Sequence, residues 1–302
     1  MLDRRRVLKT LAGLFLSGFG LSGYAYAWVP RRQNVTRYRL RPKGWPEGKR
    51  LRLAVISDLH AGGAHMPVSR VGAIVDRTNL LKPDLVLLLG DFVASRDWRP
   101  GDPQPAEWAA ELARLQAPQG CFAVLGNHDW WHDEHAQRQR RGPTLVGAAL
   151  EAVGIRVLEN EALKLDTAAG PVWLAGLGDQ WAFPRWSQGP GSRGRHRGID
   201  DLAGTLAKVT DDAPLLLMAH EPDIFARTPA RITLTVSGHT HGGQIRLFGW
   251  SPVVPSRYGN RYAYGHVVEN GRNLIVSAGL GVSDKAPVRF GVPPEIVLIE
   301  LG

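Results

Sequence analysis

The stretch LRLAVISDLH, residues 51–60, joins an apolar run to two polar side chains that can bind a metal. Residues 51–57 have the pattern of a short buried strand that ends at a turn. Asp58 and His60 follow directly. Residues at i and i+2 of a strand face the same way, so both side chains can point at one place. The stretch predicts a strand whose carboxyl end carries a pair of ligands.

The same arrangement recurs along the chain. Apolar runs at residues 84–90 and 120–126 lead into Asp91 and into the sequence Asn127-His128-Asp129. A third run precedes His220, and a fourth leads into SGHTHGG, residues 237–243, with His239 and His241 one residue apart. A Gly-Asp pair or a single histidine is by itself usually only a turn or a packed side chain. The ordered series, each member after an apolar run, is much harder to obtain by chance.

Helical patterns separate the first strands, at residues 68–80 and 105–115, and another follows at 144–153. Strands that alternate with helices predict parallel βαβ units. From residue 155 onward the predicted strands follow one another with fewer helices, and one of them is expected at 245–248. This indicates a second, partly antiparallel sheet that packs on the first.

Ligands of parallel sheets gather beyond the carboxyl ends of the strands, so five separate loops are expected to converge. Seven oxygen and nitrogen donors exceed what one tetrahedral ion needs, and two divalent ions that share a carboxylate are the natural number. The donor set suits Mn, Fe, Zn or Co, which it does not distinguish. The predicted metal ligands are Asp58, His60, Asp91, Asn127, His220, His239 and His241.

With SDLH, GNHD and SGHTHGGQ blocks, the chain from about residue 50 to 300 resembles the calcineurin-like metallophosphoesterase superfamily, in its exported or membrane-attached bacterial branch. The resemblance implies an α/β fold, a four-layer α/β/β/α sandwich of two mixed sheets flanked by helices. It also implies that Asp58, His60 and His241 hold one metal. Asn127, His220 and His239 would hold the second.

In this resemblance, Asp91 bridges the two ions, and a bridging hydroxide attacks the phosphorus of a phosphodiester or pyrophosphate. His128 lies beside the metals, faces the substrate and is the candidate general acid. Many members of the superfamily carry a second Asp three residues after the bridging one, which orients this histidine. Here that position is Ala94, so the usual carboxylate partner of His128 is missing.

The N-terminus has the composition of an export segment. Basic residues end at Lys9, no charge follows until after Val29, and AYA at 25–27 is typical of a cleavage site. The paired Arg4 and Arg5 resemble a twin-arginine signal, which makes the twin-arginine export machinery an expected partner. We expect residues 1–29 to be a signal or an N-terminal membrane anchor, 30–50 a basic connector with room for one edge strand, and 51–302 the metallophosphoesterase domain. The protein is then exported across, or anchored to, the cytoplasmic membrane.

The net charge of +9 favours anionic partners. Residues 184–198 are rich in Gly, Arg and Pro and have the composition of a loop. Either they form a solvated surface, or Arg193, Arg195 and Arg197 meet an anionic substrate, for which a lipid-linked phosphoester at a membrane surface is one candidate. Nucleic acid is not an expected partner, because the chain has no stripe of aromatic and basic residues for stacking on bases.

Three functions stay open at this point. The first is an exported metal-dependent phosphoesterase that acts on a diester or pyrophosphate. The second is a pyrophosphatase of the UDP-2,3-diacylglucosamine type in lipid A metabolism, although that synthesis is cytoplasmic and the leader points outward. The third is a non-catalytic binding protein of the cell envelope. The single cysteine, Cys121, lies in an apolar run and is expected to be a buried hydrophobic residue.

Overall fold

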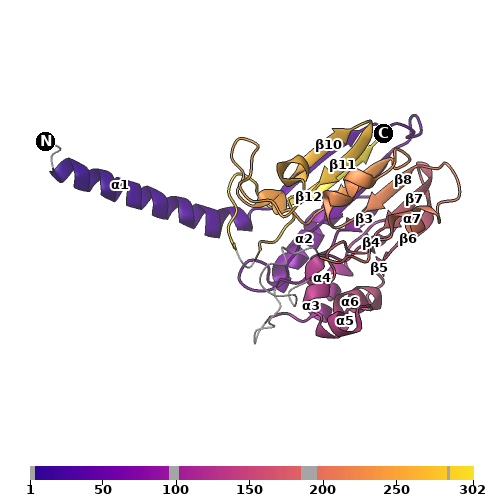
Figure 1. Cartoon of the computed structure of the whole chain (residues 1–302), viewed down its shortest axis with the longest axis horizontal. Coiled ribbons are helices and arrows are strands. Elements are labelled where there is room, and N and C mark those ends of the chain that lie inside the picture. Colours follow the sequence, from indigo (N-terminus) through magenta and orange to yellow (C-terminus); the bar gives the residue numbers. More distant parts are fainter. Residues whose placement is uncertain (1–3, 95–101, 185–195, 284–285) are drawn as a thin grey trace.

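Two six-stranded mixed sheets form the centre of the computed structural model, which describes residues 4–94, 102–184, 196–283 and 286–302 (Figure 1). In the first sheet the strand order is β1-β12-β2-β3-β4-β5. Strands β2 to β5 are parallel, and β12 is antiparallel to β2 and parallel to β1. The strands are β1 (Asn34–Leu40), β2 (Leu51–Ile56), β3 (Leu85–Leu88), β4 (Cys121–Ala123), β5 (Arg156–Val157) and β12 (Glu295–Leu301).

The second sheet has the order β10-β11-β9-β8-β7-β6. Its four central strands are parallel, and an antiparallel strand closes each edge. The strands are β6 (Glu161–Thr167), β7 (Gly170–Gly176), β8 (Leu215–Met218), β9 (Leu234–Ser237), β10 (Gly265–Glu269) and β11 (Arg272–Val276).

Alternation along each strand builds the layers. In β2, Leu53 and Val55 face the second sheet and join the core between the sheets, while Ala54 and Ile56 face the helices on the outer side. The outer faces of both sheets are covered by helices, so the expected four-layer sandwich is confirmed. The α-helices of the domain are α2 (Val68–Leu80), α3 (Pro105–Leu112), α4 (Asn127–Trp131), α5 (Glu134–Gln139), α6 (Leu145–Ala152) and α7 (Leu202–Leu206), and α1 (Arg4–Gly23) precedes the domain.

Most of the predicted helices and strands are present, and the prediction of one strand is wrong. Helix α2 has the predicted bounds, and the edge strand expected within residues 30–50 is β1. Residues 245–248 are not a strand, because Ile245 and Leu247 form only isolated bridges. The backbone of Gln244 and of Phe248 has positive φ, 56° and 50°, which breaks an extended run on both sides.

Helix α1 extends away from the two sheets (Figure 1), and its large apolar side chains are exposed. Among the described residues, no helix combines the length and the hydropathy that a membrane crossing needs. The chain after α1 continues through a single π-helical turn, Tyr24–Trp28, and a 3₁₀ turn, Val29–Arg31, which reach the domain. Val29 and Pro30 are buried there.

Cys121 packs against the core between the first sheet and its helices, and burial raises the pKa of its thiol to about 11. The thiolate is the reactive form, so we expect iodoacetamide at pH 8 to label the folded protein far more slowly than the urea-unfolded chain. Cys121→Ala should hydrolyse phosphodiesters as the unchanged protein does. Rapid labelling of the folded protein, together with loss of activity on labelling, would contradict this structural role.

Candidate metal centre

The structure brings the predicted ligands together at the carboxyl ends of strands from both sheets. Asp58 and His60 follow β2, Asp91 follows β3, and Asn127 and His128 begin α4 just after β4. The second sheet contributes His220 after β8, and His239 and His241 after β9. Two sheets that face each other thus direct their loops to one place.

Within the part of the chain that the structure describes, three groups of side chains have ligand atoms within 4.8 Å of one another: Asp58, His60 and His241; His60, Asp91 and His128; Asp91, His220 and His239. The first and third coincide with the two ligand sets that the resemblance implies, apart from Asn127. Asp91 lies 3.2 Å from Nε2 of His220 and 3.7 Å from Nε2 of His60. It is therefore placed between the two sets, as the bridging assignment requires.

Two kinds of observation fit metal ions at this place. The Nε2 atoms of His60 and His241 face each other at 3.0 Å, and Nε2 of His220 lies 3.2 Å from Oδ2 of Asp91. Among the described residues, the buried Oδ1 of Asn127 and Nε2 of His239 have no hydrogen-bond partner. A buried polar atom without a partner costs free energy unless something binds it. The donors are oxygen and imidazole nitrogen only, which suits divalent ions of the Mn, Fe, Zn and Co type.

The backbone is strained where the ligands sit. Five of the predicted ligands have positive φ, between 47° and 69°, which non-glycine residues rarely adopt. Such strain persists where the surroundings enforce it, and it concentrates at functional sites. The five residues are Asp58, His60, Asp91, His239 and His241.

Hydrogen bonds fix the direction of two imidazoles. Nδ1 of His60 lies 3.1 Å from the carbonyl of Val93, and Nδ1 of His220 lies 2.5 Å from the carbonyl of Leu89. A proton on Nδ1 directed at a carbonyl leaves the Nε2 lone pair for the centre. The backbone of the neighbouring strand end thus selects the tautomer that can bind a metal.

Burial and nearby charges keep three of the donors, Asp91, His239 and His241, in the forms that bind metals. Burial and the neighbouring His220 lower the pKa of His239 well below the usual range, and burial, His60 and Arg289 do the same for His241. Both imidazoles are then neutral at pH 7. Burial alone would raise the pKa of Asp91, but His220 and His128 hold it well below its ordinary value. A carboxylate and neutral imidazoles are the forms in which these residues ligate metals.

Two glycines allow the loops to approach. Gly90 has φ of +87°, and a Cβ on it would lie 2.4 Å from the backbone of Gly126. A Cβ on Gly238 would lie 1.8 Å from Oγ of Ser57. At Gly90 the absence of a Cβ permits a positive φ directly before Asp91. At Gly238 the reason is instead the close contact between the loops of the two sheets.

Asp129 has a role that the sequence did not reveal. Its buried carboxylate accepts hydrogen bonds from the backbone N–H groups of Asp91 and Gly126, both at 2.9 Å, and of Phe92 at 2.8 Å. It holds the loop after β3 against the start of α4. As expected, it does not orient His128.

The partner of His128 is His132, one turn later in the chain, with Nδ1 and Nε2 2.8 Å apart. Sequence analysis assigned no role to His132. An i, i+4 spacing on a short helix could have indicated the contact. Burial lowers the pKa of His128 to about 3, so this imidazole is neutral at pH 7.

Sequence analysis also did not identify Arg289 as a residue of the site. It is fully buried, and its guanidinium donates to the carbonyls of Ala278 and Gly281 and lies 3.2 Å from Nδ1 of His241. A buried arginine is costly unless its donors are satisfied, and here backbone carbonyls satisfy them. No local pattern marks this residue, because it lies 48 positions after His241.

Aromatic rings line the His128 and His239 side of the centre. Trp181 lies edge-on to His239, with centroids 4.5 Å apart, and is stacked on His196 at 4.7 Å. Trp131 lies 5.5 Å from His128 and donates its indole N–H to the carbonyl of Trp181. The neighbouring Trp130 is instead buried in the core beside Phe183.

The predicted arginine contacts have different outcomes. Arg193 and Arg195 lie outside the described residues. Arg197 is described and exposed, and its backbone pairs with Phe183. The residue of this loop that reaches the aromatic side of the centre is its neighbour His196.

Comparison with known proteins agrees with this geometry. The chain is 28% identical over 308 residues to the metallophosphoesterase YkuE of Bacillus subtilis, which covers 99% of this chain and 98% of the relative. It is 28% identical over 312 residues to the phosphodiesterase YaeI of Escherichia coli, covering all of both chains. It is 27% identical over 268 residues to a metallophosphoesterase of Aquifex aeolicus, covering 88% of this chain and 91% of the relative.

Residues 51–243 match the family model described as calcineurin-like phosphoesterase. This match begins at the first residue of β2 and ends just after His241, so it contains all seven predicted ligands. The fold, the convergence of the loops and the match together show that the chain belongs to the calcineurin-like phosphoesterase family.

Proposed function

We propose that this protein is an exported metal-dependent phosphodiesterase that hydrolyses a phosphodiester or pyrophosphate bond, at the outer face of the cytoplasmic membrane or in the periplasm. The observation that carries the reaction is the position of Asp91 in two of the three close ligand groups. Similarity over the full length to a protein named phosphodiesterase supports a diester substrate. The leader with Arg4 and Arg5 supports export by the twin-arginine route.

One divalent ion would be held by Asp58, His60 and His241. The other would be held by Asn127, His220 and His239. Asp91 would bind both ions. Such ions supply an activated water and neutralise negative charge on the phosphoryl oxygens. The chain's own part is to fix these donors in a buried site and to place His128 beside them. His128 is in ring contact with His60, at 4.8 Å between centroids, and so lies where a substrate phosphate would meet it.

The test is hydrolysis of bis(p-nitrophenyl) phosphate by the full-length chain loaded with Mn²⁺. We expect turnover that EDTA abolishes and added Mn²⁺ restores. A panel that includes p-nitrophenyl phosphate and a nucleotide sugar then separates diester, monoester and pyrophosphate activity. A protein that binds metal but cleaves none of these would favour a non-catalytic binding role instead.

We expect His128→Asn to distinguish proton donation from simple charge stabilisation. A phosphate anion bound beside His128 would favour the protonated form of its imidazole. If this imidazolium, in contact with His132, gives its proton to the leaving oxygen, a diester with an alkyl leaving group should lose about 10²-fold in kcat. A diester that releases p-nitrophenolate needs little protonation and should lose much less. The measurement is kcat for both esters in both proteins. Equal losses would assign His128 to binding or charge stabilisation, and no loss would remove it from the mechanism.

Secretion has its own test, which is independent of the chemistry. A fusion of residues 1–29 to a folded reporter should reach the periplasm of a bacterium with a working twin-arginine pathway. Replacement of Arg4 and Arg5 together by lysine should retain the reporter inside the cell. Export that does not depend on these arginines would contradict the proposed route.

A further inference from the structure

The segment that follows helix α1, residues 24–31, packs beside the candidate metal centre. The carbonyl of Ala25 accepts a hydrogen bond of 2.9 Å from the backbone N–H of Arg289, and Tyr24 meets Phe290 edge-on at 6.2 Å. The side chain of the same Arg289 lies against His241. One residue therefore joins the N-terminal segment to a predicted metal ligand.

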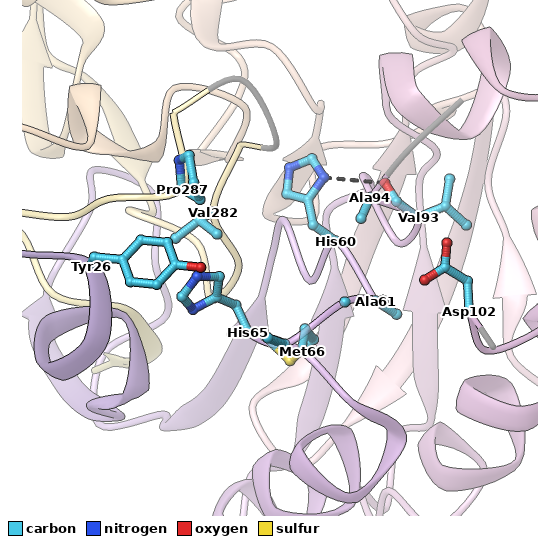
Figure 2. A pocket seen from close by; sticks show the side chains of 13 residues that line it. Tyr26, His60, Ala61, His65, Met66, Val93, Ala94, Asp102, Val282 and Pro287 are labelled. Atoms are coloured by element: carbon cyan, nitrogen blue, oxygen red, sulfur yellow. Dashed lines mark hydrogen bonds between the residues drawn. The ribbon is translucent and has the colours of Figure 1, made fainter. Parts of the chain in front are cut away.

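A cavity of about 280 Å³ lies between this segment and the centre (Figure 2). His60 forms part of its wall, so the cavity borders the predicted metal site of Asp58, His60 and His241. Tyr26 and His65 meet edge-on in its lining, with ring centroids 5.0 Å apart. The remaining walls include Met66, Val93, Val282 and Pro287.

The lining combines polar and apolar side chains, and its apolar part can hold an uncharged group. Burial, together with the charges of Arg31 and Arg70, lowers the pKa of His65, so its ring is neutral at pH 7. Ala94 contributes only a methyl group to the wall. Asp102 contributes a carboxylate, whose negative charge disfavours an anionic ligand group in the cavity. Aromatic rings favour edge-on contacts, as between Tyr26 and His65, so the two rings could contact an aromatic ligand group in the same way.

The size of the cavity limits what it can hold. Pockets that enclose a whole small-molecule ligand occupy about 300–1,000 Å³, so this one takes a part of a substrate such as one ring or a short alkyl group. His128, the candidate proton donor for the leaving oxygen, is not among the lining residues. The group that departs therefore belongs on the His128 side, and the cavity is left for the group that stays on phosphorus.

We propose that Tyr26 and His65 form a subsite for the apolar ester group that remains on phosphorus during hydrolysis, and that the chain works with residues 24–31 in place. This rests on the proposed phosphodiesterase function. The proposed subsite makes Tyr26 a residue that determines specificity. Tyr26 lies within the predicted cleavage motif at residues 25–27. Cleavage after Ala27 would remove it.

The kinetic test uses two esters that release the same p-nitrophenolate, bis(p-nitrophenyl) phosphate and methyl p-nitrophenyl phosphate, with the full-length Mn²⁺-loaded chain. Tyr26→Ala should lower kcat/KM for the aryl ester about tenfold and change that for the methyl ester less than twofold. Tyr26→Phe keeps the ring and should behave as the unchanged protein. Trp28→Ala is the matched control, since Trp28 is an aromatic residue of the same π-helical turn, 64% exposed and not part of the lining.

The outcomes separate the two proposals. Equal losses on both esters, or no loss with Tyr26→Ala, overturn the subsite while leaving the phosphodiesterase intact. An unchanged protein that cleaves neither ester overturns the proposed function and the subsite with it. N-terminal sequencing of the protein recovered from the envelope of an expressing bacterium gives an independent readout. A first residue at or before position 24 supports the subsite, and one after Tyr26 overturns it.

Discussion

Replacement of Asp91 by asparagine is expected to reduce kcat/KM for bis(p-nitrophenyl) phosphate by about 10³-fold or more, equivalent to about 4 kcal/mol of transition-state stabilisation. Asp91 is almost fully buried, and its Oδ2 lies 3.2 Å from Nε2 of His220. It is grouped with His220 and His239 of one candidate ligand set, and its Oδ2 lies 3.7 Å from Nε2 of His60 in the other. An amide keeps the shape of the side chain but loses the charge that balances two cations.

The measurement is steady-state hydrolysis together with the metal content of the purified protein. We expect the variant to hold less than the full metal complement at a given Mn²⁺ concentration. Asp76→Asn is the control, since that carboxylate forms an exposed ion pair with Arg114 and such pairs contribute little. A variant with full metal content and unchanged kcat/KM would contradict the bridging role of Asp91.

Replacement of Asp129 by alanine is expected to lower the free energy of unfolding by about 3–5 kcal/mol, because several buried backbone N–H groups lose their acceptor at once. The bonds come from Asp91, Phe92 and Gly126, which belong to two different loops. The loops should separate locally, so activity should also fall.

Urea unfolding with EDTA present measures the loss of stability without a contribution from bound metal. Asp201→Ala is the matched control. Asp201 also accepts a backbone N–H, from Gly204 at 2.8 Å, but it does so at the exposed start of α7, where the loss of a cap costs about 1 kcal/mol. Equal destabilisation by both substitutions would show that Asp129 does no more than an ordinary helix cap.

Local patterns were sufficient to predict the strands that carry ligands. The run at residues 51–57 became β2, and the helix predicted at 68–80 became α2 with the same bounds. The reason is that a buried strand or an amphipathic helix repeats its apolar residues with a period that any window of the sequence displays. The predicted strand at 245–248 is absent because Gln244 before it and Phe248 at its end have positive φ, which the apolar pattern of these residues does not indicate.

Contacts between distant residues were outside the reach of such patterns. Nothing near Arg289 in the sequence indicates that its guanidinium meets His241, or that its backbone binds Ala25. His196 likewise meets Trp181 only because the loop after β7 returns to the centre. These contacts depend on how the loops of two sheets lie against each other, which no single segment encodes.

The sequence by itself determined the fold class, the order of the strands that end in ligands, and the family resemblance, because each of these is written in local periodicity and short motifs. The tertiary structure alone decided that Asp129 supports the loop of Asp91, that His132 is the partner of His128, and that Tyr26 borders a cavity beside His60. The physical reason is that hydrogen bonds and cavities form between side chains brought together by the stacking of the two sheets, and the chain positions that take part are set by this packing rather than by their spacing.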